Sequence, residues 1–372
     1  MAWNTKKATP AKDIQAEDYC VPSPPSDGIS SLSVNDASNM LIAGSWDNSV
    51  SCYELQLGAA GNVTSAVPRM QIKHDAPVLC TAIASDGVTV FSAGCDNTVK
   101  SWNPTQGAVA QTIGQHDQPV KVMKWIPDMN VLVTGSWDKS IRVWDCRQPN
   151  PVANIPFNER IHTMDAKGQA MVVGTADKVI HVFDMKESRR ISEFQSPLPY
   201  QTRVVSIFND KNGFAIGCIE GRVGIEYFSE LSKKQPSNSL TPAPRDPKGL
   251  NFVFKCHRHK REETSASSTN SHIDVYSVND ISFHPYNTFC TAGSDGTLGF
   301  WDKDARHRLR SLDRFRNTCP ISCALFNTQG TLLFYAVSYD WSKGVEGNNP
   351  SGGNNIYIHN TAKEEIQPKS KK

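Results

Sequence analysis

One block of residues recurs along the chain and constrains its fold more than any other feature. Each copy joins an alternating apolar run, a small residue, an acidic turn residue, a second alternating run and an aromatic, as in LIAGSWDNSVSCY and LVTGSWDKSIRVW. The acidic turn residue marks seven copies, at Asp47, Asp96, Asp138, Asp177, Glu220, Asp295 and Asp340. Successive markers lie 39 to 49 residues apart, except for one interval of 75.

This period predicts an all-β, seven-bladed β-propeller. A propeller blade is a four-stranded sheet of ~40 to 45 residues, and only the next blade can cover its face. The alternation within each run is typical of strands, and the Asp-Asn, Asp-Lys and Asp-Gly turns tolerate a positive φ. We therefore expect an N-terminal arm at 1–27, the propeller at 28–360 and a solvated C-terminal tail at 361–372.

Composition excludes several other classes of protein. The 372 residues contain no apolar run long enough to cross a bilayer, and the N-terminus lacks the apolar core of a signal peptide. A soluble intracellular protein is therefore expected. The formal net charge of +2 predicts that any basic binding site is local. The ten cysteines form no CxxC pair, which favours small buried residues in a reducing compartment.

Several blocks resemble WD repeats. Trp144-Asp145 and Trp301-Asp302 end their predicted strands, and His116 lies 22 residues before Asp138. In that family a His, a strand hydroxyl, the turn Asp and the strand Trp form a buried hydrogen-bonded network. The resemblance assigns these roles to His116, Ser136, Asp138 and Trp144. The same Ser, His and Asp could form a catalytic triad, but the repeat already explains them as structural residues, so the sequence predicts no enzyme.

The interval of 75 residues predicts a long, flexible basic insertion at about 229–275, between blades five and six. Residues 245–261 hold six Lys or Arg against one Asp, and residues 303–316 hold six against two. Segments one blade apart lie side by side in a ring, so they predict a positive patch suited to an acidic peptide or single-stranded RNA. The alternative is that they are solvated loop charges. Cys256, His257, His259 and His272 match no familiar ligand spacing, so no metal or cofactor is expected.

A more specific resemblance covers nearly the whole chain. SPPSDGISSL, QHDQPVKVMKW, GFAIGCIEGRVGI, NFVFKCHRHK, GSDGTLGFWDKDAR and AVSYDWSKG occur in this order. Together they resemble the nuclear-pore-associated mRNA export factors of the WD-repeat family, whose sister family acts in the spindle checkpoint. The resemblance implies an adaptor that binds an acidic segment of a phenylalanine-glycine nucleoporin and associates with mRNP. It also implies location in the nucleus and at the nuclear pore, shuttling to the cytoplasm, and a possible place on the mitotic spindle.

The resemblance also implies which residues bind partners. The family's basic, aromatic-lined groove falls on two motifs here, and it nominates Phe254, Lys255, Trp301, Asp302, Lys303, Arg306 and Arg308. Arg258 and Arg222 are further expected contacts, Arg222 for the nucleoporin. In this hypothesis Phe254 and Trp301 stack on a base or hold an apolar side chain, while Lys and Arg pair with phosphates or carboxylates. Trp301 is also a structural WD position.

Three alternatives to the nucleoporin adaptor stay open at this point. The protein could be a direct single-stranded RNA-binding module, whose affinity would fall steeply with salt. It could be a mitotic scaffold for checkpoint kinases, as in the sister family. It could also be a substrate receptor of a ubiquitin ligase, although no motif points there. In every case we expect a monomeric propeller.

Overall fold

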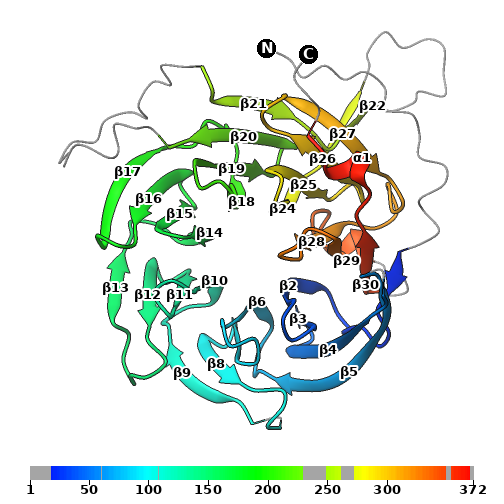
Figure 1. The fold of residues 1–372 in the computed structure, drawn as a ribbon. Helices are drawn as coiled ribbons and strands as arrows, with labels where there is room; N and C mark the ends of the chain where they lie inside the picture. The colour runs from blue at the N-terminus through cyan, green and yellow to red at the C-terminus, as the bar shows by residue number, and fades with distance from the viewer. Residues whose placement is uncertain are drawn as a thin grey trace.

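Seven four-stranded antiparallel sheets surround a central axis in the computed structural model, which describes residues 18–59, 61–107, 109–228, 249–260, 272–348 and 353–368 (Figure 1). The predicted seven-bladed β-propeller is confirmed. Blades one and two consist of β2 (Ile29–Asn35), β3 (Met40–Ser45), β4 (Ser49–Leu57) and β5 (Val63–Lys73), then β6 (Val78–Ile83), β7 (Val90–Gly94), β8 (Thr98–Trp102) and β9 (Gln111–Gln115).

The next three blades follow in chain order. Blade three consists of β10 (Val120–Ile126), β11 (Val131–Ser136), β12 (Ser140–Trp144) and β13 (Ala153–Pro156). Blade four consists of β14 (Ile161–Lys167), β15 (Ala170–Thr175), β16 (Val179–Asp184) and β17 (Arg189–Gln195). Blade five consists of β18 (Thr202–Ile207), β19 (Gly213–Cys218), β20 (Arg222–Tyr227) and β21 (Phe252–Lys255).

The last two blades bring the chain termini together. Blade six consists of β24 (Val278–Phe283), β25 (Thr288–Gly293), β26 (Leu298–Asp302) and β27 (His307–Leu312). Blade seven consists of β28 (Ile321–Phe326), β29 (Leu332–Val337), β30 (Asn355–Asn360) and the N-terminal strand β1 (Tyr19–Cys20). A hairpin of β22 (Arg258–Lys260) and β23 (Ile273–Val275), the 3-10 helix η2 (Val345–Gly347) and the helix α1 (Lys363–Ile366) complete the described elements.

Apolar side chains from neighbouring blades form the core. Val133 and Ile141 of blade three, for example, pack in one buried cluster with Ile161 and Met171 of blade four. Burying this surface is favourable by about 25 cal/mol per Å², and a blade can realise the gain only when its neighbour is present. The ring therefore folds as a unit.

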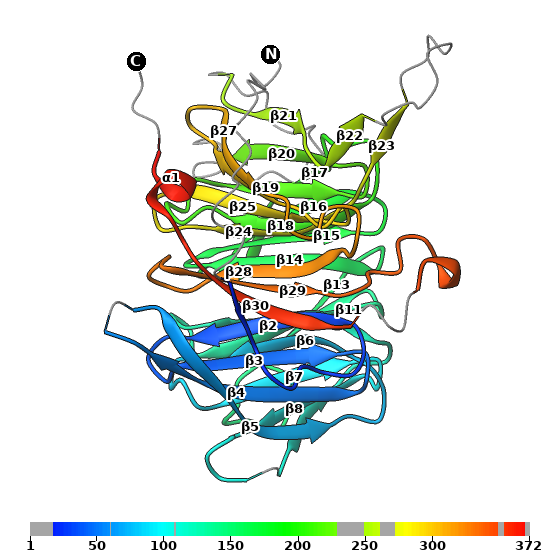
Figure 2. The ribbon, with the colours of Figure 1, turned by 90° about the vertical axis from the view of Figure 1, so that its right-hand side faces the viewer.

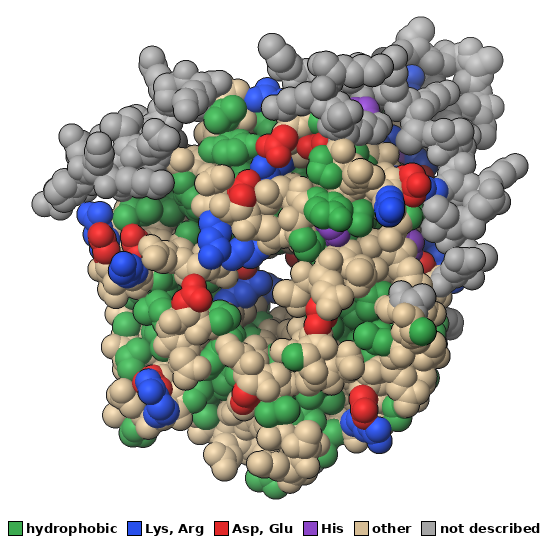
Figure 3. Space-filling model, viewed as in Figure 1, with side chains coloured by type: hydrophobic (Ala, Val, Ile, Leu, Met, Phe, Trp, Pro, Cys, Tyr) green, Lys and Arg blue, Asp and Glu red, His purple; other side chains and the backbone are tan. Residues whose placement is uncertain are grey.

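The strand order places equivalent connections on the same face. The turns between second and third strands, and the connections between blades, all lie at the end where the innermost strands begin. We call this end the turn face. Figure 2 shows η2 and the hairpin β22–β23 on this side and α1 on the opposite side, which faces the viewer in Figures 1 and 3. As predicted, turn residues such as Asn48, Asn97 and Lys139 have φ of 68°, 63° and 67°.

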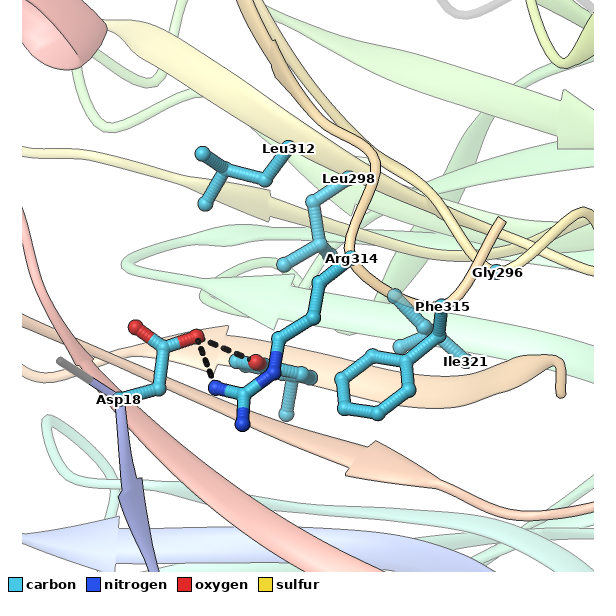
Figure 4. Close-up of a pocket in the computed structure, with 8 residues that line it drawn as sticks. Asp18, Gly296, Leu298, Leu312, Arg314, Phe315 and Ile321 are labelled. Carbon is cyan, nitrogen blue, oxygen red and sulfur yellow. Dashed lines mark hydrogen bonds and ion pairs between the residues drawn. The ribbon is translucent and has the colours of Figure 1, made fainter. Parts of the chain in front are cut away.

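The predicted boundary at residue 28 is wrong, because β1 pairs with β30 as the outer strand of blade seven. Asp18, beside it, contacts three side chains. Its Oδ1 lies 2.7 Å from Nδ1 of His359, and its Oδ2 accepts a 2.5 Å hydrogen bond from Tyr335. Figure 4 shows the same carboxylate turned toward the guanidinium of Arg314, at 3.6 Å. The N-terminal segment therefore closes the ring.

The predicted C-terminal tail is also partly packed rather than solvated. Glu365 and Ile366 of α1 are buried, and Nε2 of His359 lies 2.9 Å from the Glu365 carboxylate. Of the predicted flexible insertion, residues 229–248 and 261–271 lie outside the described residues. The remainder supplies β21 and both strands of the hairpin β22–β23, so it is not simply a loop.

Two expectations about chain chemistry can be compared with the structure. All ten cysteines are unpaired; six of them are buried, while Cys20 and Cys146 are exposed. Within the described ranges, no helix is both long enough and apolar enough to cross a membrane.

Candidate partner-binding site

The buried hydrogen-bonded network of blade three is present, but its hydroxyl differs from the prediction. Oγ1 of Thr134 lies 2.8 Å from Nε2 of His116 and accepts a 2.8 Å hydrogen bond from Nε1 of Trp144. Nδ1 of His116 lies 2.8 Å from the Asp138 carboxylate. Burial raises the pKa of Asp138, but hydrogen bonds from His116 and Ser140 outweigh it and hold that pKa below its ordinary value.

Ser136 was assigned to this network and does not belong to it. Its Oγ donates to the backbone carbonyls of Gln118 and Pro119, at 2.9 and 3.0 Å. Ser136 lies two residues further along β11 than Thr134, at the end of the strand, where its Oγ also accepts a 3.0 Å hydrogen bond from the backbone N–H of Asp138. The Ser, His and Asp of this blade consequently do not form a triad.

Equivalent networks occur in two other blades. In blade two, His74 contacts Ser92 and Asp96, at 2.8 and 2.7 Å. In blade six, Thr291 contacts His257 at 2.8 Å and Trp301 at 3.0 Å, while His257 contacts Asp295 at 2.9 Å. The insertion lengthens the interval between His257 and Asp295 to 38 residues, so a search at the usual spacing misses this histidine.

The two aromatic residues predicted to line the basic groove are instead part of the core. Phe254 and Trp301 are 3% and 5% exposed, and their ring centroids lie 4.8 Å apart. Neither ring is available to stack on a base. Phe252 is half-buried two residues earlier on β21, and the Arg306 guanidinium lies 4.5 Å from its ring centroid.

Two predicted polar contacts in this region also serve the fold. Asp302 is buried, and its Oδ1 accepts hydrogen bonds from the backbone N–H groups of Asp304 and Ala305. The Lys303 side chain is 2% exposed, and its Nζ lies 2.9 Å from Asp304 and 3.5 Å from Asp210. The same ammonium lies 4.9 Å from the ring centroid of Phe208. Lys303 is therefore committed to contacts within the protein and does not face a partner.

Arg258 and Arg222, the two further predicted contacts, both form ion pairs with Glu220. Nη2 of Arg258 lies 2.8 Å from the Glu220 carboxylate, and Nε of Arg222 lies 3.0 Å from its other oxygen. Burial raises the pKa of Glu220, but these contacts outweigh it and lower that pKa. Lys255 is exposed and Arg306 and Arg308 are partly exposed, although Arg306 also donates to the carbonyl of Gly249 at 2.7 Å. The predicted groove is thereby reduced to these three cations.

The turn face carries an aromatic surface that the sequence analysis did not identify. The residues just before the acidic turn residues of blades one, three and five are Trp46, Trp137 and Ile219. The backbone N–H of each donates to a carbonyl just before the innermost strand of its own blade. Trp46 and Ile219 are each 41% exposed, and Trp341 in blade seven is 45% exposed. Large apolar side chains therefore surround the central channel on this face.

A ring of seven bulge residues forms the mouth of the channel on the turn face. Each innermost strand pairs with its neighbour through a register shift that leaves one residue unpaired near its start. These residues are Ser30, Leu79, Lys121, His162, Arg203, Asn279 and Ser322. A bulge redirects its side chain, and such sites are frequent at the rims of barrels. We call this set the mouth ring.

The mouth ring is basic on one side only. Lys121, His162 and Arg203 come from blades three, four and five, and the other four members are uncharged. Burial lowers the pKa of Lys121, and the nearby charge of Arg203 lowers it further. At the other end of the channel, Lys and Arg side chains gather beside the visible opening (Figure 3). The spacing of these three basic residues could have indicated the arc, because successive members lie 41 residues apart, close to one blade repeat.

Comparison with known proteins is consistent with this architecture. A family model described as "WD domain, G-beta repeat" matches residues 19–54, 67–103, 107–145 and 264–302. A solved structure titled "Structure of U3-55K" aligns with a TM-score of 0.72 over 93% of this chain and 99% of its own, at 18% identity, which supports the fold alone.

Curated relatives are more specific. The chain is 39% identical to "mRNA export factor GLE2" of Chaetomium thermophilum, over 93% of this chain and 91% of the relative. It is 39% identical to "Protein Rae1" of Drosophila melanogaster, over 95% and 96%. It is 41% identical to "mRNA export factor" of Xenopus tropicalis, over 99% and 94%. The chain belongs to the WD-repeat family of mRNA export factors.

Proposed function

We propose that this protein is a non-enzymatic adaptor in mRNA export, which binds an acidic segment of a phenylalanine-glycine nucleoporin across its turn face. Relatives named mRNA export factor support the export role. The observation that carries the binding site is the combination on one face of the exposed Trp46 and Trp341 and the partly exposed Trp137 with the basic side of the mouth ring. Tethering to such a nucleoporin would place the protein at the nuclear pore and let it shuttle with its cargo.

The chemistry of this face suits an extended acidic peptide that carries apolar residues. Trp46, Trp137 and Trp341 offer large contact areas at low cost in side-chain entropy, as is usual for residues that dominate binding energy. Lys121 and Arg203 supply charges that a carboxylate can neutralise in a partly enclosed space, where the attraction is stronger than at an open surface. Specific peptide recognition needs both kinds of contact.

We further propose that the protein contacts RNA or mRNP weakly through Lys255, Arg306 and Arg308, on the outer strands of blades five and six. These cations are accessible to solvent, whereas the predicted aromatic partners are buried. Phosphate contacts without base stacking give little sequence preference and a strong dependence on salt.

Fluorescence anisotropy with an acidic nucleoporin peptide and with single-stranded RNA, at two salt concentrations, tests both sites. The paired variant Trp46→Ala and Trp137→Ala should weaken peptide binding at least about tenfold and leave RNA binding unchanged. The matched control, Arg306→Glu with Arg308→Glu, should do the reverse. Peptide binding that survives loss of both tryptophans would overturn the turn-face assignment, and tight RNA binding without peptide binding would favour an RNA-binding module.

A further inference from the structure

The three polar but uncharged members of the mouth ring bridge neighbouring blades. Oγ of Ser30 donates to the carbonyl of Val78 at 2.6 Å, and Nδ2 of Asn279 donates to that of Ile321 at 2.9 Å. Oγ of Ser322 donates to the carbonyl of Ile29 at 2.7 Å and completes the contact between blades seven and one. On this part of the mouth ring the bulge therefore has a structural purpose.

The basic members do not form such bridges. Among the described residues, Lys121 and Arg203 have no hydrogen-bond acceptor or carboxylate within contact distance, and Nδ1 of His162 contacts only the amide of Gln201, at 3.0 Å. The lysine and arginine come from bulges two blades apart, with the imidazole between them in sequence and in the ring. Three nitrogen-bearing side chains thus lie on the same arc of the channel mouth with donor groups unused.

Nearby carboxylates act on this arc electrostatically but make their hydrogen bonds to other groups. Asp340 and Asp280 both influence Arg203 electrostatically. Asp340 accepts hydrogen bonds from Asn279 and Ser294, and Asp280 accepts them from the backbone N–H groups of Ile281 and Ala324. Deeper in the channel, Lys124 is already paired with Asp165 at 3.0 Å. In the part of the chain that the structure describes, Lys121 and Arg203 therefore have no direct ion-pair partner, although both carboxylates act on Arg203 from a distance.

We propose that the basic arc of the mouth ring is a binding site for a phosphoryl group. A guanidinium can donate two parallel hydrogen bonds to two oxygens of such a group, and the ammonium of Lys121 adds a point charge. Nδ1 of His162 faces the side-chain N–H of Gln201, so the neutral ring carries its proton on Nε2, which can donate a further hydrogen bond to the third oxygen. A phosphoryl dianion would neutralise both fixed charges at once, whereas a single carboxylate would leave one of them unmatched.

Two sources share this chemistry: free phosphate and a phosphorylated side chain. The proposal rests on the proposed function only if the side chain belongs to the acidic segment. It therefore deepens that function by making binding sensitive to phosphorylation, but the site itself is testable without any peptide.

Isothermal titration of the full chain with inorganic phosphate, acetyl-phosphoserine amide and acetyl-serine amide separates these cases. Saturable phosphate binding, weakened about tenfold or more by Arg203→Gln or Lys121→Gln, is the expected result. The matched control is Arg69→Gln, which also removes a guanidinium but lies on β5, the outer strand of blade one, where it pairs with Glu54, and it should bind phosphate like the wild type. Circular dichroism confirms that each variant is folded.

The outcomes decide the proposal and its source. Binding of both phosphate and acetyl-phosphoserine amide, with none of acetyl-serine amide, would assign the site to phosphorylated side chains. Binding of phosphate alone would support the site and assign it to the free ion. Absence of saturable binding, or equal losses in the Arg203 and Arg69 variants, would overturn the proposal. Since no acidic segment is present in this titration, its failure would leave the proposed nucleoporin binding untouched.

Discussion

Nδ1 of His359 lies 2.7 Å from the carboxylate of Asp18, a residue 341 positions earlier in the chain. The other ring nitrogen lies 2.9 Å from Glu365, so one imidazole joins the N-terminal segment, β30 and α1. All three residues are buried or nearly so. Closure of the ring thus depends on a buried ionic contact as well as on the pairing of β1 with β30.

This contact makes stability depend on pH. Burial lowers the pKa of His359, but the two carboxylates outweigh it and raise that pKa to about 9 from the ordinary value of 6.5. The stabilisation should be fully present below about pH 6.5 and lost as the pH rises through about 9. Urea unfolding at about pH 6 and about pH 9 measures the difference.

The variant His359→Gln should lower the free energy of unfolding by about 3 kcal/mol at the lower pH, because it leaves buried carboxylates unmatched. It should also flatten the dependence on pH over this range. A variant that retains the wild-type pH dependence would show that another group is responsible.

Replacement of Thr134 by Val should destabilise the protein by about 2 to 3 kcal/mol, because the change leaves the buried indole N–H of Trp144 without an acceptor and Nε2 of His116 without a partner. Ser136→Ala should cost only about 1 kcal/mol, since Ser136 serves local backbone groups. Urea denaturation of both variants distinguishes the two positions. The reverse order would restore Ser136 to the network.

Much of the fold was predictable because each blade uses the same strand pattern and the same acidic turn. Asp138 and Asp96 occupy identical turns, so marker spacing alone fixed the number of blades. The choice between Ser136 and Thr134 was not predictable in the same way, because both are hydroxyl residues on one strand and only the register with His116 decides. Ring closure by Asp18 could not be predicted from the sequence, since no local pattern connects this residue to His359.

The candidate site was likewise predictable only in part. The sequence marked basic segments correctly, but charge runs do not tell which cations are already paired inside the protein, as Lys303 is. Phe254 and Trp301 are each followed by a charged residue in the chain, yet both rings lie in the core shared by blades five and six. Lys121 and Arg203 gather through bulges in separate blades, which only the three-dimensional arrangement reveals.

Lys303 and Arg308 should behave differently although they lie five residues apart in the hairpin of β26 and β27. Lys303→Met should destabilise the fold by about 2 kcal/mol, because the buried ammonium contacts two carboxylates. Arg308→Glu should change stability by less than about 0.5 kcal/mol and weaken RNA binding, with a smaller salt dependence. Thermal unfolding and RNA anisotropy measure both. Equal effects of the two variants on RNA binding alone would contradict the buried position of Lys303.

The cysteines should differ in reactivity according to exposure. Burial raises the pKa of Cys52 and of Cys80 to about 12, so these thiols are protonated and shielded near neutral pH. Iodoacetamide should modify Cys20 first, then Cys146, whose pKa is raised by partial burial and Asp145. Mass spectrometry over time gives the order. Early labelling of Cys80 in the folded protein would contradict the packing of blade two.

The most direct test of the account is amide hydrogen exchange of the full chain with and without an acidic nucleoporin peptide. The account predicts that the peptide slows exchange in the turns that contain Trp46, Trp137 and Ile219 and at the starts of β10, β14 and β18. Protection confined to β21 and β27, with the turn face unchanged, would contradict it and return the peptide to the groove between blades five and six.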